Sequence, residues 1–147
     1  MKEKDTKKSK VIKIVVTTVA FIIAFFISFK VSRGLFSSGD DLENQLKKAV
    51  VEVNNAAPMQ VDEYTRLDSA AMVKKDGFAY YYTLNLTKED VDLDTVNKYV
   101  RPRVIEQVKT SKDLKGFRDN DVTLYYRYYD TNAQYVMEFK ITPDIYK

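Results

Sequence analysis

The first pattern along the chain is a long apolar run near its N-terminus. Residues 14–29 contain no charged side chain and consist mostly of Val, Ile, Phe and Ala. A helix of this length spans roughly 24 Å, slightly less than a hydrocarbon core of about 30 Å, and apolar neighbours on both sides extend it. The pattern therefore predicts a transmembrane helix over residues 11–31, in contact with membrane lipid.

Basic residues before this run set its expected orientation. Six lysines and two acidic residues lie within residues 1–13, whereas only Lys30 and Arg33 follow the run closely. The positive-inside rule therefore predicts a single-pass cell-membrane protein with a cytoplasmic N-terminus. A cleaved signal peptide is the competing interpretation, but Phe-Lys-Val-Ser-Arg-Gly at 29–34 is a poor cleavage site. The predicted organisation is a cytoplasmic basic tail at 1–10, an uncleaved transmembrane signal anchor at 11–31, a linker at 32–40 and an extracytoplasmic α+β domain at 41–147.

Helical periodicity begins directly after the linker. Apolar positions repeat every three or four residues over 41–56, with Asp40 as the expected N-cap and Glu43 three residues later. A second helical region opens near Thr87, where Asp92 and Asp94 are alternative caps. It carries an apolar stripe at four-residue spacing, made of Val96, Val100, Val104 and Val108. Pro102 falls within this stripe and is expected to kink the helix, because proline removes a backbone hydrogen bond.

Alternation of apolar and polar residues predicts two β-hairpins. The first pairs residues 67–73 with 78–86 across a Lys-Asp-Gly turn, and the second pairs 122–128 with 135–141. The side chains expected on the core face are Phe78, Tyr80, Tyr82, Leu84, Leu86, Val122, Leu124, Tyr126, Tyr128, Tyr135, Met137, Phe139 and Ile141. After the transmembrane helix, the order helix-hairpin-helix-hairpin predicts an α+β fold with helices on one face of a four-stranded antiparallel sheet.

Composition narrows the chemistry that this domain can perform. The chain contains no His, no Cys and no Trp. It therefore has no imidazole base, no cysteine nucleophile and no thiolate or imidazole metal site. Residues 40–147 hold 16 basic and 19 acidic residues, a net charge of −3. This balance is unlike that of a nucleic-acid-binding domain, so no nucleic-acid partner is expected.

Three segments resemble a known group of proteins. They are Pro-Met-Gln-Val-Asp-Glu-Tyr-Thr-Arg-Leu-Asp at 58–68, Tyr-Tyr-Tyr-Thr-Leu at 80–84, and Asp-Val-Thr-Leu-Tyr-Tyr-Arg-Tyr-Tyr-Asp at 121–130. The chain resembles small, mostly uncharacterised, membrane-anchored bacterial envelope proteins that carry a P-M-x-V-D-x-x-T-R-L-D stretch. The resemblance covers residues 42–144 and implies an envelope location but no particular activity. Similar proteins often carry cysteines near the positions of Val108 and Ile145, so this chain resembles a cysteine-free relative.

The densest group of charges in the domain surrounds Arg66. If Asp62 or Asp68 holds the guanidinium, Arg66 can present its remaining donors to an anionic ligand or partner. The alternative is a structural ion pair that ties the strand to a loop or helix.

A separate group of acidic residues lies at 89–94. It lacks the ligand pattern of a calcium loop and is better explained by helix capping, so no metal site is expected.

Tyrosines and one arginine gather on the non-core face of the predicted sheet. Strand alternation places Tyr81, Tyr125 and Tyr129 there together with Arg127. Tyrosine and arginine are frequent at interface hot spots, so this face is a candidate binding surface for a peptide or glycan. The alternative is that the tyrosines only stabilise the sheet through cross-strand pairs.

These observations favour a non-enzymatic envelope protein. We predict an extracytoplasmic binding or accessory module with an envelope protein as its partner, and with no cofactor, no metal and no catalytic residue. The alternative is a small ligand-binding domain, or a hydrolytic domain based on carboxylates, that acts on cell-wall material. A ligand pocket of a few hundred Å³ with convergent polar groups would favour the alternative.

Overall fold

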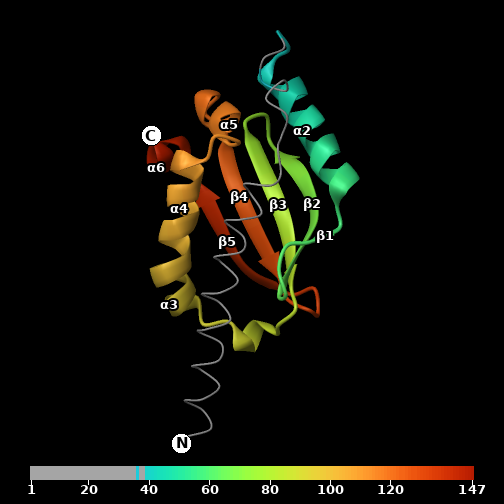
Figure 1. Cartoon of the computed structure of the whole chain (residues 1–147), viewed down its shortest axis with the longest axis vertical. Helices are drawn as coiled ribbons and strands as arrows, with labels where there is room; N and C mark the ends of the chain where they lie inside the picture. The colour runs from blue at the N-terminus through green and yellow to red at the C-terminus, as the bar shows by residue number, and fades with distance from the viewer. Residues whose placement is uncertain (1–35, 37–38) are drawn as a thin grey trace, which may run out of the picture.

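The computed structural model of the chain describes residue 36 and residues 39–147. Within this part a five-stranded mixed sheet has the strand order β1-β2-β3-β4-β5. Helix α2 lies beside the β2 side of the sheet and helix α4 beside the β5 side (Figure 1). The strands are β1 (Met59–Gln60), β2 (Thr65–Val73), β3 (Gly77–Leu84), β4 (Thr123–Tyr129) and β5 (Tyr135–Ile141). The helices are α2 (Leu42–Ala56), η1 (Lys88–Asp90), α3 (Leu93–Thr95), η2 (Val96–Val100), α4 (Arg101–Thr110), α5 (Lys115–Asp119) and α6 (Pro143–Tyr146).

Helix α2 begins one residue later than its sequence pattern indicated. The side chain of Asp41, not of Asp40, accepts a hydrogen bond from the backbone N–H of Asn44 at 2.9 Å. This bond satisfies one of the backbone donors that every helix start leaves unpaired. The helix then buries Leu46, Ala49 and Val53 against the sheet.

The predicted four-stranded antiparallel sheet is wrong. Strands β2 and β3 do form an antiparallel pair, but β4 pairs with β3 in parallel, and the short β1 adds a fifth strand beside β2. The reason is the long connection after β3, which contains η1, α3, η2, α4 and α5. These helices carry the chain back to the end of the sheet where β3 began, so β4 enters in the same direction as β3.

Pro102 is accommodated by a π-helical turn. The backbone N–H of Arg101 bonds to the carbonyl of Val96, five residues back, in the η2 segment. In a regular α-helix the proline ring would clash with the carbonyl four residues earlier and leave it without a donor. The wider turn before the proline avoids this clash, and the chain continues directly into α4.

A register shift in β5 overturns one predicted core residue. Tyr128 pairs with Met137 but Tyr129 pairs with Tyr135, so Val136 is an extra residue in β5. Because such a bulge reverses the facing of the residues beyond it, Val136 is buried, whereas Tyr135 is 50% exposed and not in the core.

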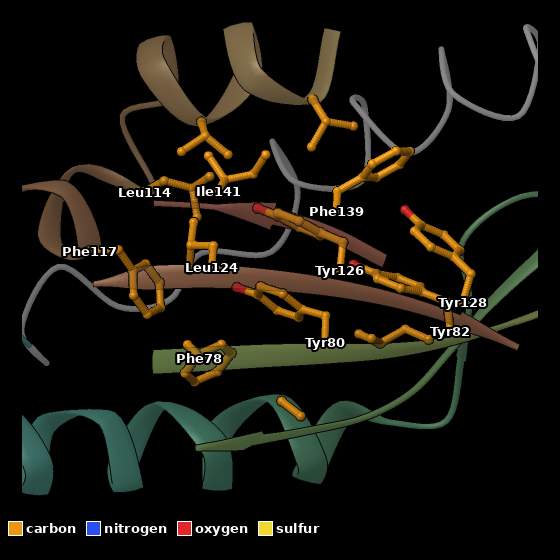
Figure 2. Close-up of a cluster of buried hydrophobic side chains, with 14 of the residues drawn as sticks. Phe78, Tyr80, Tyr82, Leu114, Phe117, Leu124, Tyr126, Tyr128, Phe139 and Ile141 are labelled. Atoms are coloured by element: carbon orange, nitrogen blue, oxygen red, sulfur yellow. The ribbon is translucent and has the colours of Figure 1, made fainter. Parts of the chain in front are cut away.

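The core lies on the helix-bearing face of the sheet and is rich in tyrosine. The side chains of Phe78, Tyr80 and Tyr82 on β3 stand beside those of Leu124, Tyr126 and Tyr128 on β4 (Figure 2). The parallel register brings Tyr82 and Tyr128 together as stacked rings, with centroids 5.0 Å apart. Offset stacking of this kind adds to the burial of the rings.

The membrane prediction concerns another part of the chain. None of the helices in the described part is both long and apolar enough to cross a membrane. The predicted span at 11–31, the tail at 1–10 and most of the predicted linker at 32–40 lie outside the described residues.

Candidate functional site

The sheet face opposite the core carries the tyrosines and the arginine that strand alternation predicted there. The strand register places Tyr81 beside Arg127 and Arg127 beside Glu138, in one row across β3, β4 and β5. The neighbouring rows contain Tyr125 and Tyr129. We call Tyr81, Tyr125, Arg127 and Tyr129 the tyrosine face.

Arg127 is the residue that links the side chains of the tyrosine face. Its Nε donates to Glu138 at 2.5 Å and its Nη1 donates to the Tyr81 hydroxyl at 2.8 Å. Its guanidinium carbon also lies 5.6 Å and 5.2 Å from the ring centroids of Tyr81 and Tyr125, within cation–π range. The hydrogen bond that Arg127 donates to the Glu138 carboxylate raises the pKa of Arg127 above its ordinary value. The charge of Arg127 therefore interacts with Glu138, Tyr81 and Tyr125, and these contacts fix the orientation of both rings.

The aromatic surface continues from Arg127 toward the β4–β5 turn. The rings of Tyr81 and Tyr129 stack with centroids 6.4 Å apart, and Tyr129 meets Tyr135 edge-on at 6.0 Å. Tyr135 was predicted in the core, and the bulge in β5 adds it to this surface instead. The result is a partly exposed aromatic strip, two of whose members, Tyr81 and Tyr129, line a hollow together with Arg66.

Arg66 is held in a different way from Arg127. Its Nε donates to Asp68, and the other oxygen of Asp68 accepts a hydrogen bond from the hydroxyl of Thr83, each at 2.5 Å. Its Nη groups have no hydrogen-bond partner among the described residues, and half of the side chain is exposed. The guanidinium is therefore oriented at one edge while its outer donors are free.

Two open hollows meet at Arg66. One has a volume of about 260 Å³ and the other about 330 Å³, and both are lined by Arg66, Thr83 and Thr131. The first hollow also includes Gln60, Tyr64, Leu84 and Asn85. The second also includes Asp68, Ser69, Tyr81, Tyr129, Asp130 and Ala133. Tyrosines and polar side chains thus line both hollows together with Arg66.

Asp62 does not hold Arg66. It lies between β1 and β2, where its Oδ1 accepts a hydrogen bond from the backbone N–H of Tyr64 at 2.8 Å. Burial raises the pKa of Asp62, although the backbone N–H groups of Tyr64 and Thr65 oppose this effect. Asp62 thus shapes the loop before β2, and of the two predicted partners it is Asp68 that pairs with Arg66.

Sequence reasoning missed several residues that build the site. Thr83 and Glu138 fix the two arginines, and Asp130 fixes the β4–β5 turn by accepting hydrogen bonds from the backbone of Lys88, Asn132 and Gln134. Glu138 could have been predicted from the sequence, because it lies opposite Arg127 in a β4–β5 hairpin with this register. Asp130 gave no such signal, because its contact with Lys88 depends on the long connection after β3.

Two of the acidic residues at 89–94, Asp90 and Asp92, make helix-capping hydrogen bonds. Asp90 accepts hydrogen bonds from the backbone N–H and the hydroxyl of Thr87, and Asp92 accepts from the backbone of Asp94 and Thr95. Among the described residues, no group of three or more acidic side chains is arranged to hold a metal ion.

The sequence model of a family described as a domain of unknown function, DUF8479, matches residues 41–137. The chain belongs to this family. The matched region contains every residue of the tyrosine face and both hollows. No curated protein matches the chain.

Three solved structures share the fold of this DUF8479 member. The first is a presumed secreted protein from Pseudomonas aeruginosa, with 14% identity, a TM-score of 0.62, and coverage of 80% of this chain and 99% of that one. The second is the pilotin EpsS from the Vibrio vulnificus type 2 secretion system, with 8% identity, a TM-score of 0.59, and coverage of 72% and 92%. The third is the type II secretion system pilotin AspS from Vibrio cholerae, with 12% identity, a TM-score of 0.53, and coverage of 71% and 91%. At these identities the likeness establishes the fold alone.

Proposed function

We propose that this chain is an extracytoplasmic accessory module of the bacterial envelope that binds a partner protein and is not an enzyme. In this proposal residues 11–31 anchor the chain in the cell membrane with its N-terminus in the cytoplasm. The apolar run and the lysines that precede it support the anchor. The lack of His and Cys supports binding over the commonest kinds of acid–base and nucleophilic catalysis.

The observation that carries the proposal is the arrangement around Arg66. Two parallel N–H donors of a guanidinium match the two oxygens of a carboxylate, so the free edge of Arg66 fits an acidic group of the partner. Asp68 and Thr83 orient the guanidinium before the partner arrives, which reduces the conformational entropy lost on binding. The adjoining tyrosines offer rigid contact area next to the charged centre.

The fold supports an accessory role. Two of the three similar structures are named as pilotins of type 2 secretion systems, and the third as a secreted protein. These names favour an extracytoplasmic location and a partner within an envelope assembly. The resemblance to membrane-anchored envelope proteins, read from the motif at 58–68, agrees with the same proposal.

A second candidate function is supported by the size of the hollows. Their volumes of about 260 and 330 Å³ fall near the lower end of the range for small-molecule sites, and polar groups line both. A fragment of cell-wall material could stack on Tyr81 and Tyr129 while its polar groups meet Arg66 and Thr83. The two candidates share one site and differ in what occupies it.

Photo-crosslinking in native membranes tests both candidates. A photoreactive residue is placed at Tyr81, at Tyr129 and, as a control, at the exposed Val51 of α2. We expect a discrete protein adduct from the first two positions and none from the third. Arg66→Ala should reduce the adduct at least tenfold, whereas Arg103→Ala, a change of an exposed arginine on α4, should leave it unchanged.

Three other outcomes would contradict the proposal in different ways. Glycan adducts without protein adducts would favour the second candidate over the first. Equal adducts from position 51 and position 81 would mean that the tyrosine face is not the contact surface. A protein adduct that is insensitive to Arg66→Ala would remove the arginine from the mechanism of binding.

A further inference from the structure

Phe36 is the residue closest to the predicted membrane span that the structure describes, and it packs into the domain. Its ring lies 5.1 Å from the ring of Phe117 on α5, with the planes at 66° to each other. Phe117 in turn lies 5.1 Å from Phe78 at the start of β3. Phe36 thus extends the row of aromatic rings that begins in the core, at the α5 end of the sheet.

Gly116 provides the space for this contact. A Cβ atom added at Gly116 would lie 2.3 to 2.9 Å from three ring atoms of Phe36, closer than real Cβ atoms approach a neighbour. No side chain larger than hydrogen fits between them unless Phe36 moves away. The contact therefore depends on a specific small residue on α5, in addition to apolar attraction.

The position of Phe36 limits the orientations that the domain can take relative to a membrane. If the span ends at residue 31, five residue steps of at most about 3.6 Å separate its end from Phe36. The α5 end of the sheet is then within about 18 Å of the place where the chain leaves the lipid. A linker without contacts over 32–40 would permit the domain any orientation relative to the membrane. A Phe36 that packs on Phe117 permits only a few orientations.

We infer that the Phe36 contact makes the α5 end of the domain its membrane-proximal end, so that the Arg66 hollows point away from the lipid. The β4–β5 turn lies at the end of the sheet opposite α5 (Figure 1). Both hollows are lined by Thr131 of this turn, and the second hollow also by Tyr81 and Tyr129 of the tyrosine face. Along β3, Thr83 lies five residues beyond Phe78, or about 17 Å further from the α5 end. This inference rests on the proposed membrane anchor but not on the identity of the partner.

The contact itself can be tested by an engineered disulfide, because the chain has no cysteine of its own. The added Cβ of Gly116 lies 2.6 Å from Cγ of Phe36, which is one bond of about 1.5 Å from its Cβ. The two Cβ atoms are therefore at most about 4 Å apart, within the range of disulfides. We expect the full-length Phe36→Cys, Gly116→Cys chain in membrane vesicles to crosslink almost completely under mild oxidation. A Phe36→Cys, Asn132→Cys chain is the mismatched control, and equal crosslinking of the two pairs would overturn the inference.

Orientation is measured by energy transfer from the domain to the membrane. Single cysteines replace the exposed Lys112, just before α5, or Asn132, in the β4–β5 turn, and carry a donor dye in the full-length chain. The vesicles contain phosphatidylethanolamine, phosphatidylglycerol and an acceptor-labelled lipid headgroup. We expect at least twofold more transfer from position 112 than from position 132. Phe36→Ala should abolish this difference, whereas Tyr99→Ala, which removes an exposed aromatic ring, should preserve it.

The outcomes separate this inference from the proposed function. A chain that does not float with the vesicles would refute the anchor, and this inference with it. A chain that floats but shows equal transfer from positions 112 and 132 would refute the orientation alone. Crosslinking at the tyrosine face is an independent measurement, so loss of the partner contact leaves this result unaffected.

Discussion

Removing a hydroxyl from the core should stabilise this domain. Tyr82 is fully buried on β3, and its hydroxyl oxygen has no hydrogen-bond partner among the described residues. Burial also raises the pKa of Tyr82 well above its ordinary value, so the phenol is neutral under ordinary conditions. The substitution Tyr82→Phe keeps the ring and its stack on Tyr128 and deletes only the unpaired oxygen.

The expected gain follows from the cost of burying a polar group. A hydroxyl that enters a protein interior without a hydrogen bond costs about 1–3 kcal/mol in mutational data. The lost oxygen also made weak dispersion contacts, which offset part of this gain. We therefore expect the free energy of unfolding to rise by about 1 kcal/mol, which raises Tm by roughly 4 °C in a domain of this size.

Tyr146 provides the matched control with the opposite sign. Its hydroxyl is also buried, but it donates to the backbone carbonyl of Val122 at 2.9 Å. The substitution Tyr146→Phe leaves that carbonyl without its donor and should lower the free energy of unfolding by about 1–2 kcal/mol. The same chemical change therefore has opposite effects at two buried tyrosines.

Guanidinium denaturation of the full-length chain in detergent micelles, followed by circular dichroism at 222 nm, measures both variants. Thermal unfolding gives the corresponding Tm values. If Tyr82→Phe lowers stability as much as Tyr146→Phe does, the Tyr82 hydroxyl has a partner and the reasoning is wrong. Equal m-values for the variants and the parent chain are needed for the comparison to concern the folded state.

Three further predictions concern the edge of the sheet, the tyrosine face and pH. Asn54→Ala removes two hydrogen bonds from α2 to the backbone of β2 and should lower the free energy of unfolding by about 2 kcal/mol in urea denaturation. Arg127→Ala leaves the three-quarters-buried Glu138 without its partner and should cost about 1 kcal/mol in the same assay. Burial raises the pKa of Tyr146 to about 12 and that of the core phenols further, so unfolding releases protons above about pH 10. The phenols should therefore leave stability unchanged between about pH 7 and pH 10 and lower it as pH rises further, with absorbance at 295 nm reporting tyrosinate.

Each of these predictions has a result that contradicts it. Asn55→Ala changes an exposed neighbour and should alter stability by less than about 0.5 kcal/mol, so an equal loss would deny the role of Asn54. If the Arg127→Ala chain had unchanged stability and unchanged partner crosslinking, the contacts of Arg127 would be needed neither for folding nor for binding. Gradual titration of all tyrosines below pH 11, without unfolding, would show that the core phenols reach solvent.

Local patterns were sufficient for α2 and the four long strands, and for the faces of most of their residues. The period-two alternation along β3 and β4 identified Phe78, Tyr80, Leu124 and Tyr126 as core residues, because each strand repeats its facing every second residue. It also placed Tyr81 and Arg127 together on the other face. The helical repeat located α2 within one residue at its start, because an amphipathic stripe depends only on near neighbours.

Strand pairing was decided by contacts that a local pattern does not contain. Alternation is the same in a parallel and an antiparallel pair, so it could not place β4 beside β3 in parallel. The bulge that exposes Tyr135 changes the count of residues in one strand only, and no periodicity shows it.

The same division applies to the candidate site. The sequence indicated Arg66 among acidic residues and Arg127 among the tyrosines, but it could not show which arginine keeps free donors. Arg127 is satisfied by Glu138 on one neighbouring strand and Tyr81 on the other, whereas Arg66 meets only Asp68 and keeps its outer donors. That difference depends on register and exposure across three strands. The sequence thus determined which residues share a face at most strand positions, although not at the bulge that moves Tyr135. The tertiary structure decided which arginine is free to bind, because hydrogen-bond partners are fixed by distance in space and not along the chain.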